Sequence, residues 1–308
     1  MLPSLALLAR CALVAAVAGL VQEAPPAPAG EPVLREEFHP SGEPRLRYQE
    51  LETAPGVWVK HGLWRAWYAS GLGESAGAYD QGKAHGEWQY FYPNGHLASA
   101  GRYEHGQADG VWTDYHTEKD RKVLEGRYDD GVPVGTWTWW DDDGLLQARS
   151  EFAGGVQDGR WAYYAPSGKV IEQGAFRDGR EDGDWAFWYE SGQPLAQGRY
   201  EAGRRVGPWT FWHEQGEKSA QGRYDAGHRA GAWTFWHENG AVAEMGGFRD
   251  GLAEGPWLAW DDAGRPVSEG SYHADLFHGA WTFRNADGDV EQSATYADGR
   301  VAGERPGR

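Results

Sequence analysis

The sequence predicts an all-β protein that is an elongated repeat array of stacked antiparallel β-hairpins. From Gly62 to Gly279 the tripeptide Gly-x-Trp recurs in ten copies, at intervals of 24 residues with one interval of 25. Much of the apolar side-chain area belongs to 18 Trp, 15 Tyr and 10 Phe, which accompany 45 Gly. Short polar triplets that end in Gly separate the aromatic segments. A fixed period of this length is typical of repeat proteins, in which each unit packs mainly on its neighbours.

The repeat unit is clearest in residues 207–230, where Gly207 is position 1 and Trp209 is position 3. An aromatic residue follows at position 6, Gly at position 10, usually Gly at position 16, Tyr or Phe at position 18 and usually Gly at position 21. Aromatic and Thr-rich segments bounded by turn residues predict one strand over positions 2–7 and a second over positions 12–19. We expect the tryptophans at position 3 to anchor the repeats in the core: Trp64, Trp88, Trp112, Trp137, Trp161, Trp185, Trp209, Trp233, Trp257 and Trp281.

Both links between strands carry the sequence signal of a turn. Triplets such as Pro93-Asn94-Gly95 end in Gly, which favours a type I turn followed by a glycine bulge. The glycine at position 21, such as Gly179, is expected to start the link to the next hairpin. Residues 116–120 contain one extra residue and no Gly, so we expect a longer, charged loop there. Glycine at position 16 would let a ring from a neighbouring strand lie flat on the backbone.

Side chains alternate between the two faces of a strand, so positions 3 and 5 share one face and position 6 lies on the other. Two arrangements remain open: a sheet with both sides partly covered, or a narrow solenoid with one face in water. The tryptophans at position 6 either pack on neighbouring repeats or form an exposed ladder that binds a ligand. This candidate binding ladder comprises Trp67, Trp140, Trp188, Trp212, Trp236 and Trp260.

The chain divides into five segments. Residues 1–21 carry one positive charge, an apolar run and an Ala-x-Ala signal, which indicates a secretory signal peptide, with a retained membrane anchor as the alternative. Residues 22–35 are rich in Pro and Ala and predict an extended linker without packed structure. Residues 36–61 are an N-terminal cap with a half repeat, residues 62–302 hold ten repeats, and residues 303–308 form a C-terminal tail. We therefore expect an exported protein, periplasmic or extracellular.

The formal net charge of −17 makes the chain strongly acidic. An acidic surface repels the phosphates of nucleic acids and of anionic membrane surfaces, so neither is an expected partner. The single cysteine, Cys11, lies in the predicted signal peptide, which excludes disulfides and cysteine-ligated metal sites from the repeats. We expect a monomer whose partner is an unknown protein or a component of the cell envelope.

No catalytic motif is found in the sequence, so we predict no enzyme, no catalytic residues and no cofactor. His213 and His237 share position 7, but they would lie two strands, about 9.6 Å, apart, which is too far to share one metal ion. We therefore predict that these histidines are solvated. The acidic turns at residues 141–143 and 261–262 either bind calcium weakly or cap their own backbone. The second interpretation is favoured, so no metal site is predicted.

The unit Gly-x-Trp-x-x-aromatic-x-x-x-Gly, followed by Gly-x-Tyr-x-x-Gly, resembles MORN repeats (membrane occupation and recognition nexus). It is more closely similar to the bacterial variant of YwqK-like proteins, which are often labelled antitoxins. The resemblance covers about Phe38 to Gly303. It implies a sheet of stacked β-hairpins and a role in scaffolding, protein interaction or membrane association, and it brings no catalytic residues.

Three functions are open as hypotheses. The first is a non-enzymatic exported scaffold that binds a protein or cell-envelope partner. The second is a carbohydrate-binding surface, in which exposed tryptophan rings along a groove stack on sugar rings. The third is an antitoxin-like protein that neutralises a partner toxin.

Overall fold

The computed structural model describes residues 30–306, which form β-strands joined by turns, with no helix among them. The predicted signal peptide and the first part of the predicted linker lie outside the described residues. The chain forms two compact units, Met1–Gly144 and Leu145–Arg308. Within each unit, successive strands pair as antiparallel hairpins, which confirms the predicted all-β class and the stacked-hairpin repeat.

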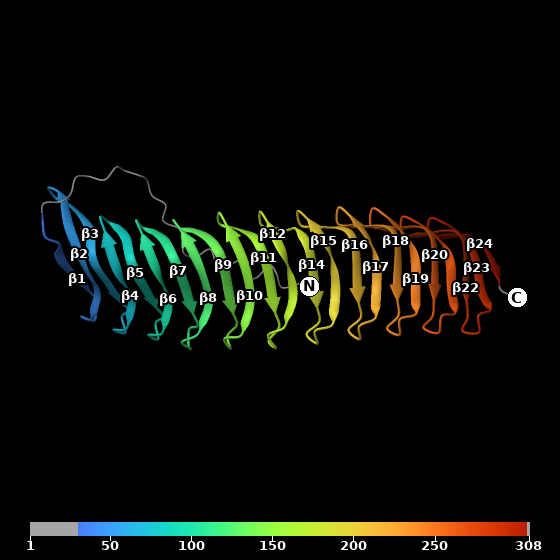
Figure 1. Ribbon diagram of the computed structural model, residues 1–308, viewed down its shortest axis with the longest axis horizontal. Coiled ribbons are helices and arrows are strands. Elements are labelled where there is room, and N and C mark those ends of the chain that lie inside the picture. Colours follow the sequence, from blue (N-terminus) through green and yellow to red (C-terminus); the bar gives the residue numbers. More distant parts are fainter. Residues whose placement is uncertain (1–29, 307–308) are drawn as a thin grey trace. The chain divides into compact units, whose positions relative to one another are not determined.

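In the first unit each strand pairs with the next strand along the chain, and Figure 1 shows these strands side by side in that order. The strands are β1 (Val33–Phe38), β2 (Pro44–Ala54), β3 (Val57–Trp67), β4 (Gly73–Asp80), β5 (Lys83–Phe91), β6 (Leu97–Glu104), β7 (Gln107–Tyr115), β8 (Lys122–Asp129) and β9 (Val132–Trp140).

The second unit has the same order, with one interrupted strand. β12 pairs with the two-residue β13 and, beyond Asp182, with β14. The strands are β10 (Leu146–Ala153), β11 (Val156–Tyr164), β12 (Val170–Arg177), β13 (Arg180–Glu181), β14 (Gly183–Trp188), β15 (Pro194–Glu201), β16 (Arg204–Trp212), β17 (Lys218–Asp225), β18 (His228–Trp236), β19 (Val242–Arg249), β20 (Leu252–Trp260), β21 (Pro266–His273), β22 (Leu276–Arg284), β23 (Val290–Ala297) and β24 (Arg300–Pro306).

Two turn types alternate along both units. Between β5 and β6, Gly95 N donates to Tyr92 O at 2.8 Å and Gly95 has a φ of +89°, which confirms the predicted type I turn with a glycine bulge. For the link between one hairpin and the next, the sequence predicted only that the glycine at position 21 starts it. In the structure it is itself a two-residue turn, formed between β6 and β7 by His105 and Gly106 with φ of +50° and +87°. Positive φ at both central residues defines a type I′ turn, whose twist suits antiparallel strands.

The loop predicted around residues 116–120 is confirmed as longer than its counterparts. His116 N donates to Arg121 O at 2.9 Å, so the loop encloses one more residue than the turn after β5. β7 ends at Tyr115 and β8 begins at Lys122. The insertion therefore stays in the loop and leaves the pairing of β7 with β8 intact.

The first strand of each repeat begins earlier than predicted. β16 starts at Arg204, before Gly207, and not at position 2 of the repeat. Gly207 has a φ of +65°, and opposite it the register of β15 shifts between Gln197 and Arg199. The predicted boundary was wrong because a glycine with positive φ can form a β-bulge, through which the strand bends and continues.

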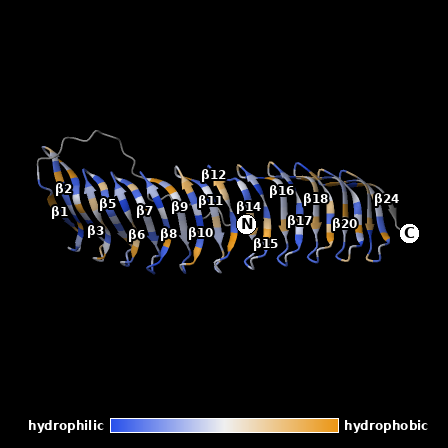
Figure 2. Ribbon diagram, in the orientation of Figure 1, coloured by the Kyte–Doolittle hydropathy of each residue, from blue (hydrophilic) through white to orange (hydrophobic). Residues whose placement is uncertain are grey.

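The core of each unit is a layer of aromatic rings on one side of the strands. Trp209 is fully buried, and its ring centroid lies 5.2 Å from that of Tyr200, edge to face, and 5.8 Å from that of Phe211, stacked. Rings at positions 3, 5 and 18 make such contacts in both units and define what we call the aromatic face. Hydrophobic and hydrophilic residues are interspersed along the strands (Figure 2), as expected when only one side of each strand joins the core.

The structure places nine of the ten position-3 tryptophans in this core, and Trp64 is half-buried. The buried ones are Trp88, Trp112, Trp137, Trp161, Trp185, Trp209, Trp233, Trp257 and Trp281.

The ends of the strand arrays depart from the predicted segments. β1 begins at Val33, inside the predicted linker, and pairs with β2, where Arg35 Nε lies 3.2 Å from Glu50 Oε2. The last proline of the linker is Pro32, so every residue after it has the N–H that a paired strand can donate. At the other end, β24 continues through residues 303–306 of the predicted tail.

Candidate functional site

The tryptophans of the aromatic face lie flat on glycines of the preceding repeat. A Cβ on Gly198 would come within 2.2 Å of ring atoms of Trp209, and Trp209 Nε1 donates to Arg199 O at 3.2 Å. The predicted contact of a ring on the position-16 glycine is confirmed, and its partner is the tryptophan of the following repeat. The glycines that meet a ring in this way are Gly77, Gly101, Gly126, Gly174, Gly198, Gly222, Gly246 and Gly270.

The six tryptophans of the candidate binding ladder are all half-buried, so they are neither fully packed nor fully exposed. In the second unit four of them lie on every second paired strand: β14, β16, β18 and β20. Alternate strands are about 10 Å apart, so these rings form a row with regular spacing. Lys218 Nζ lies 5.7 Å from the ring centroid of Trp236, so a cation of this chain lies over that ring. Binding by this row stays a prediction.

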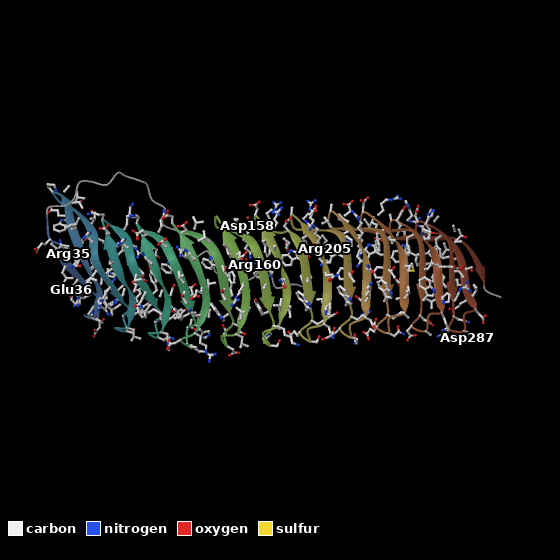
Figure 3. All side chains as sticks on the ribbon, viewed as in Figure 1. Arg35, Glu36, Asp158, Arg160, Arg205 and Asp287 are labelled. Carbon is white, nitrogen blue, oxygen red and sulfur yellow. The ribbon has the colours of Figure 1, made fainter. Side chains whose placement is uncertain are left out.

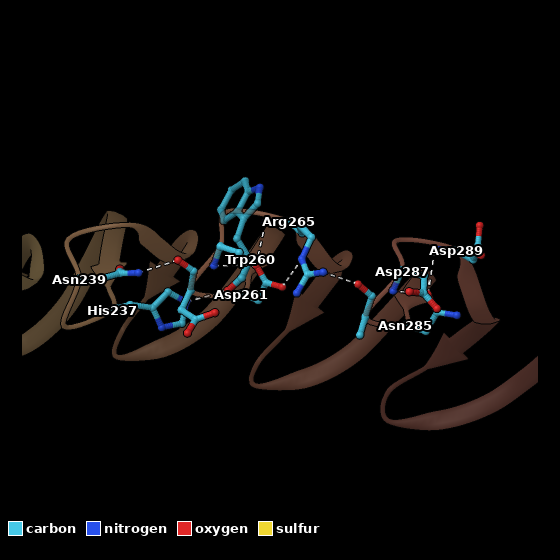
Figure 4. A network of polar contacts seen from close by, with 11 residues as sticks. His237, Asn239, Trp260, Asp261, Arg265, Asn285, Asp287 and Asp289 are labelled. Atoms are coloured by element: carbon cyan, nitrogen blue, oxygen red, sulfur yellow. Dashed lines mark hydrogen bonds and ion pairs between the residues drawn. The ribbon is translucent and has the colours of Figure 1, made fainter.

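The histidines at position 7 are not simply solvated, and this prediction was wrong. His213 Nε2 lies 2.9 Å from Trp236 O, and His237 Nε2 lies 2.9 Å from Trp260 O, as Figure 4 shows for the second pair. Tyr189 makes the equivalent contact to Trp212 O at 2.8 Å. These side chains are half-buried because they bridge to the backbone of the next repeat, a contact that no periodicity argument reveals.

The acidic turns cap their own backbone. Asp261 Oδ1 accepts hydrogen bonds from Arg265 N at 2.8 Å and Ala263 N at 3.0 Å, and Asp261 Oδ2 lies 2.8 Å from Arg265 Nε (Figure 4). The backbone hydrogen bond from Arg265 is the main reason why the pKa of Asp261 is lowered. In the other turn Asp143 N donates to Asp141 Oδ1 at 3.0 Å. Within residues 30–306 no cluster of three His, Cys, Asp or Glu side chains is placed to hold a metal ion.

Cations at position 23, two residues before the Gly-x-Trp glycine, cover several of the position-3 tryptophans. The guanidinium carbon of Arg205, marked in Figure 3, lies 4.5 Å from the ring centroid of Trp209. Arg229 lies 4.7 Å from Trp233 in the same way, and Lys60 Nζ lies 4.1 Å from the ring of Trp64. A cation over an indole face is attracted by the ring quadrupole. Position 23 therefore faces the aromatic core, which the sequence analysis did not anticipate.

A cavity of about 210 Å³ lies on the aromatic face of the second unit, between Trp257 and Trp281. Ala253 and Ala259 line it, together with Tyr272, which lies between the two indoles. Sequence reasoning missed this cavity. Its signal is the pair of alanines: position 5 carries Ala259 where both preceding repeats carry Phe, and position 23 carries Ala253 where they carry Arg.

The fold and the ring-on-glycine packing define a repeat protein of stacked β-hairpins. The chain is a MORN-like repeat protein: the family model described as "MORN repeat variant" matches residues 84–105 and 181–202. The first match spans most of the β5–β6 hairpin, and the second spans β14 and β15. No curated protein matches the sequence at a significant level.

Similar solved structures are distant in sequence and much larger. The crystal structure of TcdB2-TccC3 without hypervariable C-terminal region is 12% identical, with a TM-score of 0.17, over 84% of this chain and 16% of that chain. The Photorhabdus luminescens Tc holotoxin pore is 11% identical, with a TM-score of 0.14, over 84% of this chain and 20% of that chain. This chain thus corresponds to a fifth or less of the length of either. In the described part of the chain, no helix has the length and apolar character that crossing a membrane requires.

Proposed function

We propose that this protein is a non-enzymatic, exported scaffold that binds a protein or cell-envelope partner through the tryptophan row of its second unit. The observation that carries the proposal is the half-burial of Trp188, Trp212, Trp236 and Trp260 on alternate strands. Half-exposed tryptophan offers a large apolar ring to a partner, and tryptophan dominates the binding energy of many interfaces.

The row is also held in place before any partner arrives. The backbone carbonyls of Trp212, Trp236 and Trp260 each accept a hydrogen bond from a position-7 side chain of the preceding repeat. A surface that is ordered in the free protein loses less conformational entropy on association. The charge of −17 adds a preference for partners with a basic surface.

A pull-down from the cell-envelope fraction tests this proposal. We expect the wild type to capture a specific partner and the variant Trp212→Ser with Trp236→Ser to lose it. Thr234→Ala with Thr282→Ala is the matched control, because both threonines are half-buried at position 4 of their repeats. Circular dichroism first shows that each variant is folded. Equal capture by the tryptophan variant and the control would contradict the proposal.

Export depends on residues 1–21 and has its own test. We expect the intact mass of the protein from the periplasm or medium to correspond to a chain cleaved after the Ala-x-Ala signal. A full-length, uncleaved product in the cytosol would contradict export. That result would favour the antitoxin-like hypothesis, since a cytoplasmic toxin is accessible only to a cytoplasmic protein.

A carbohydrate ligand is the second candidate function, and an open hollow of about 650 Å³ favours it. Gln173, Gln197 and Thr210 line this hollow with amides and a hydroxyl, and Asp184 adds a carboxylate. Such groups hydrogen-bond to sugar hydroxyls, while neighbouring tryptophans could stack on the ring. We expect tryptophan fluorescence to change on titration with cell-wall glycans, and to change less in Gln197→Ala. An unchanged spectrum with all glycans would remove this candidate.

A further inference from the structure

The cavity between Trp257 and Trp281 exists because two side chains of the repeat are missing from it. In the preceding repeat Phe235 stacks on Trp233 with ring centroids 5.9 Å apart. Ala259 occupies the equivalent position 5 and supplies no ring. The cavity is about 210 Å³ in volume, and an engineered apolar cavity of about 150 Å³ already admits benzene. A planar guanidinium group therefore has room here.

The molecule shows what fills this space in the neighbouring repeats. The guanidinium carbon of Arg229 lies 4.7 Å from the ring centroid of Trp233 and 5.2 Å from that of Phe248. One repeat earlier Arg205 lies 4.5 Å from Trp209 and 5.5 Å from Tyr224. Ala253 occupies the corresponding position before Trp257. The indole of Trp257 therefore lacks the arginine that covers the indoles of Trp209 and Trp233.

Two carboxylates line the same cavity. Glu244 pairs directly with Ala259 across β19 and β20, so both side chains project from one face of the sheet. Asp275 lies in the turn between β21 and β22 and contributes the second carboxylate. Burial, and then the charges of Glu244 and Asp275, raise the pKa of Tyr272, whose ring lines the cavity with them.

Asp275 is also unusual in its backbone. It has a φ of +67°, at the place where the equivalent turns carry glycine, as in Gly227 and Gly251. Aspartate adopts the left-handed conformation more readily than most non-glycine residues, so the turn keeps its geometry and gains a carboxylate. The Asp275 carboxylate accepts a hydrogen bond from Ala253 N, which fixes it at the rim of the cavity.

We propose that this cavity binds the side chain of an arginine from a partner polypeptide, in the place that Arg229 takes one repeat earlier. The indoles of Trp257 and Trp281 and the ring of Tyr272 hold the guanidinium, and Glu244 and Asp275 balance its charge. The guanidinium is weakly hydrated and stacks on aromatic faces, which suits a partly closed aromatic site. The proposal deepens the scaffold function by naming a residue of the partner, yet it concerns the aromatic face and not the tryptophan row.

The test uses the full chain and the peptide acetyl-Gly-Arg-Gly-amide, with the citrulline peptide of the same shape as the neutral control. Indole N–H signals in a two-dimensional NMR titration report binding, and Trp257→Phe assigns one of them. We expect the Arg peptide to shift the signals of Trp257 and Trp281, with a dissociation constant on the order of 1 mM for this single side chain. We expect the citrulline peptide to bind at least about tenfold more weakly.

Two variants and one control test whether binding of the Arg peptide depends on the cavity. Ala253→Arg restores the residue of the preceding repeats, and we expect it to fold, fill the cavity and abolish peptide binding. Glu244→Gln should weaken binding about fivefold, whereas Glu238→Gln, in the turn after β18, should leave it unchanged. Equal binding of the Arg and citrulline peptides, or undiminished binding to Ala253→Arg, would overturn the proposal. Either result would leave the pull-down with the tryptophan-row variants unaffected, so the two proposals fail separately.

Discussion

Trp161 donates its indole N–H to Glu172 Oε1 at 3.0 Å, toward the strand that follows it. Its counterpart Trp185, on β14, donates in the other direction, to Ala175 O on the paired strand β12, at 3.2 Å. The difference has a local cause. Ser150 pairs with Trp161 where other repeats carry glycine, and its side chain occupies the surface on which the ring would lie. The ring therefore turns to the next strand and brings a carboxyl group into the core.

The buried carboxyl group predicts a pH effect. Burial raises the pKa of Glu172 above its ordinary value of 4.5, although the hydrogen bond from Trp161 opposes the shift. A carboxyl with a raised pKa contributes stability at pH values below the unfolded pKa and loses it as the pH rises through the folded pKa. Glu172→Gln keeps an acceptor for Trp161 and cannot ionise. We expect the variant to gain stability relative to wild type as the pH rises from about 4 to about 8.

Thermal unfolding of both proteins across this pH range checks the prediction. The difference in Tm is the relevant quantity, because the other carboxylates titrate equally in both proteins. A difference that stays constant with pH would show that Glu172 does not ionise in a buried site.

The contact of Gly198 with Trp209 predicts a strong response to one methyl group. Gly198→Ala places a Cβ 2.2 Å from ring atoms of a fully buried indole. We expect a loss of about 1–3 kcal/mol or more in the free energy of unfolding, because the ring cannot move without disturbing the next repeat. Gly73→Ala is the control, since the nearest atom to its Cβ, on Phe91, lies 3.9 Å away. Urea denaturation measures the free energy of unfolding of both variants. Equal losses in the two variants would show that the close contact of Gly198 with the Trp209 ring does not set the cost.

The bridge from His237 to Trp260 O predicts which substitutions are tolerated. His237→Phe removes the hydrogen bond and should lower the free energy of unfolding by about 1 kcal/mol. His237→Tyr should restore most of it, because Tyr189 reaches the equivalent carbonyl at 2.8 Å. Chemical denaturation compares the two variants. If Phe and Tyr are equally destabilising, the hydrogen bond contributes nothing to the repeat.

Position in the array should set the cost of losing a core ring. Trp209→Ala should lower the free energy of unfolding by about 3–5 kcal/mol, because the ring is fully buried between repeats on both sides. Trp281→Ala should cost less, because a terminal repeat can unfold locally without the rest. Denaturation and hydrogen exchange of the two variants test this expectation. Equal losses at both positions would contradict an array held by nearest-neighbour contacts.

The candidate site was less predictable than the fold. The period placed Trp212 and Trp236 at equivalent points on one face, but their half-burial depends on contacts between repeats. Position 23 shows the limit most clearly. Arg205 and Arg229 look like ordinary surface charges in the sequence because they precede the predicted strand, whereas in the structure the strand already includes them and they lie over the indoles. A residue whose surroundings come from another strand, or from a bent strand, cannot be assigned by periodicity.

The sequence by itself determined the class and the repeat of this protein. A repeat of 24 residues that contains Gly-x-Trp can bury its aromatic rings only against neighbouring copies of the repeat. The polar triplets that end in Gly restrict the chain to a few turn types. The tertiary structure decided how individual repeats differ from one another. The indole of Trp161 turns toward Glu172, and Ala253 and Ala259 leave a cavity beside Trp257. These features arise where one repeat meets the next, so they depend on distances between strands that no single repeat contains.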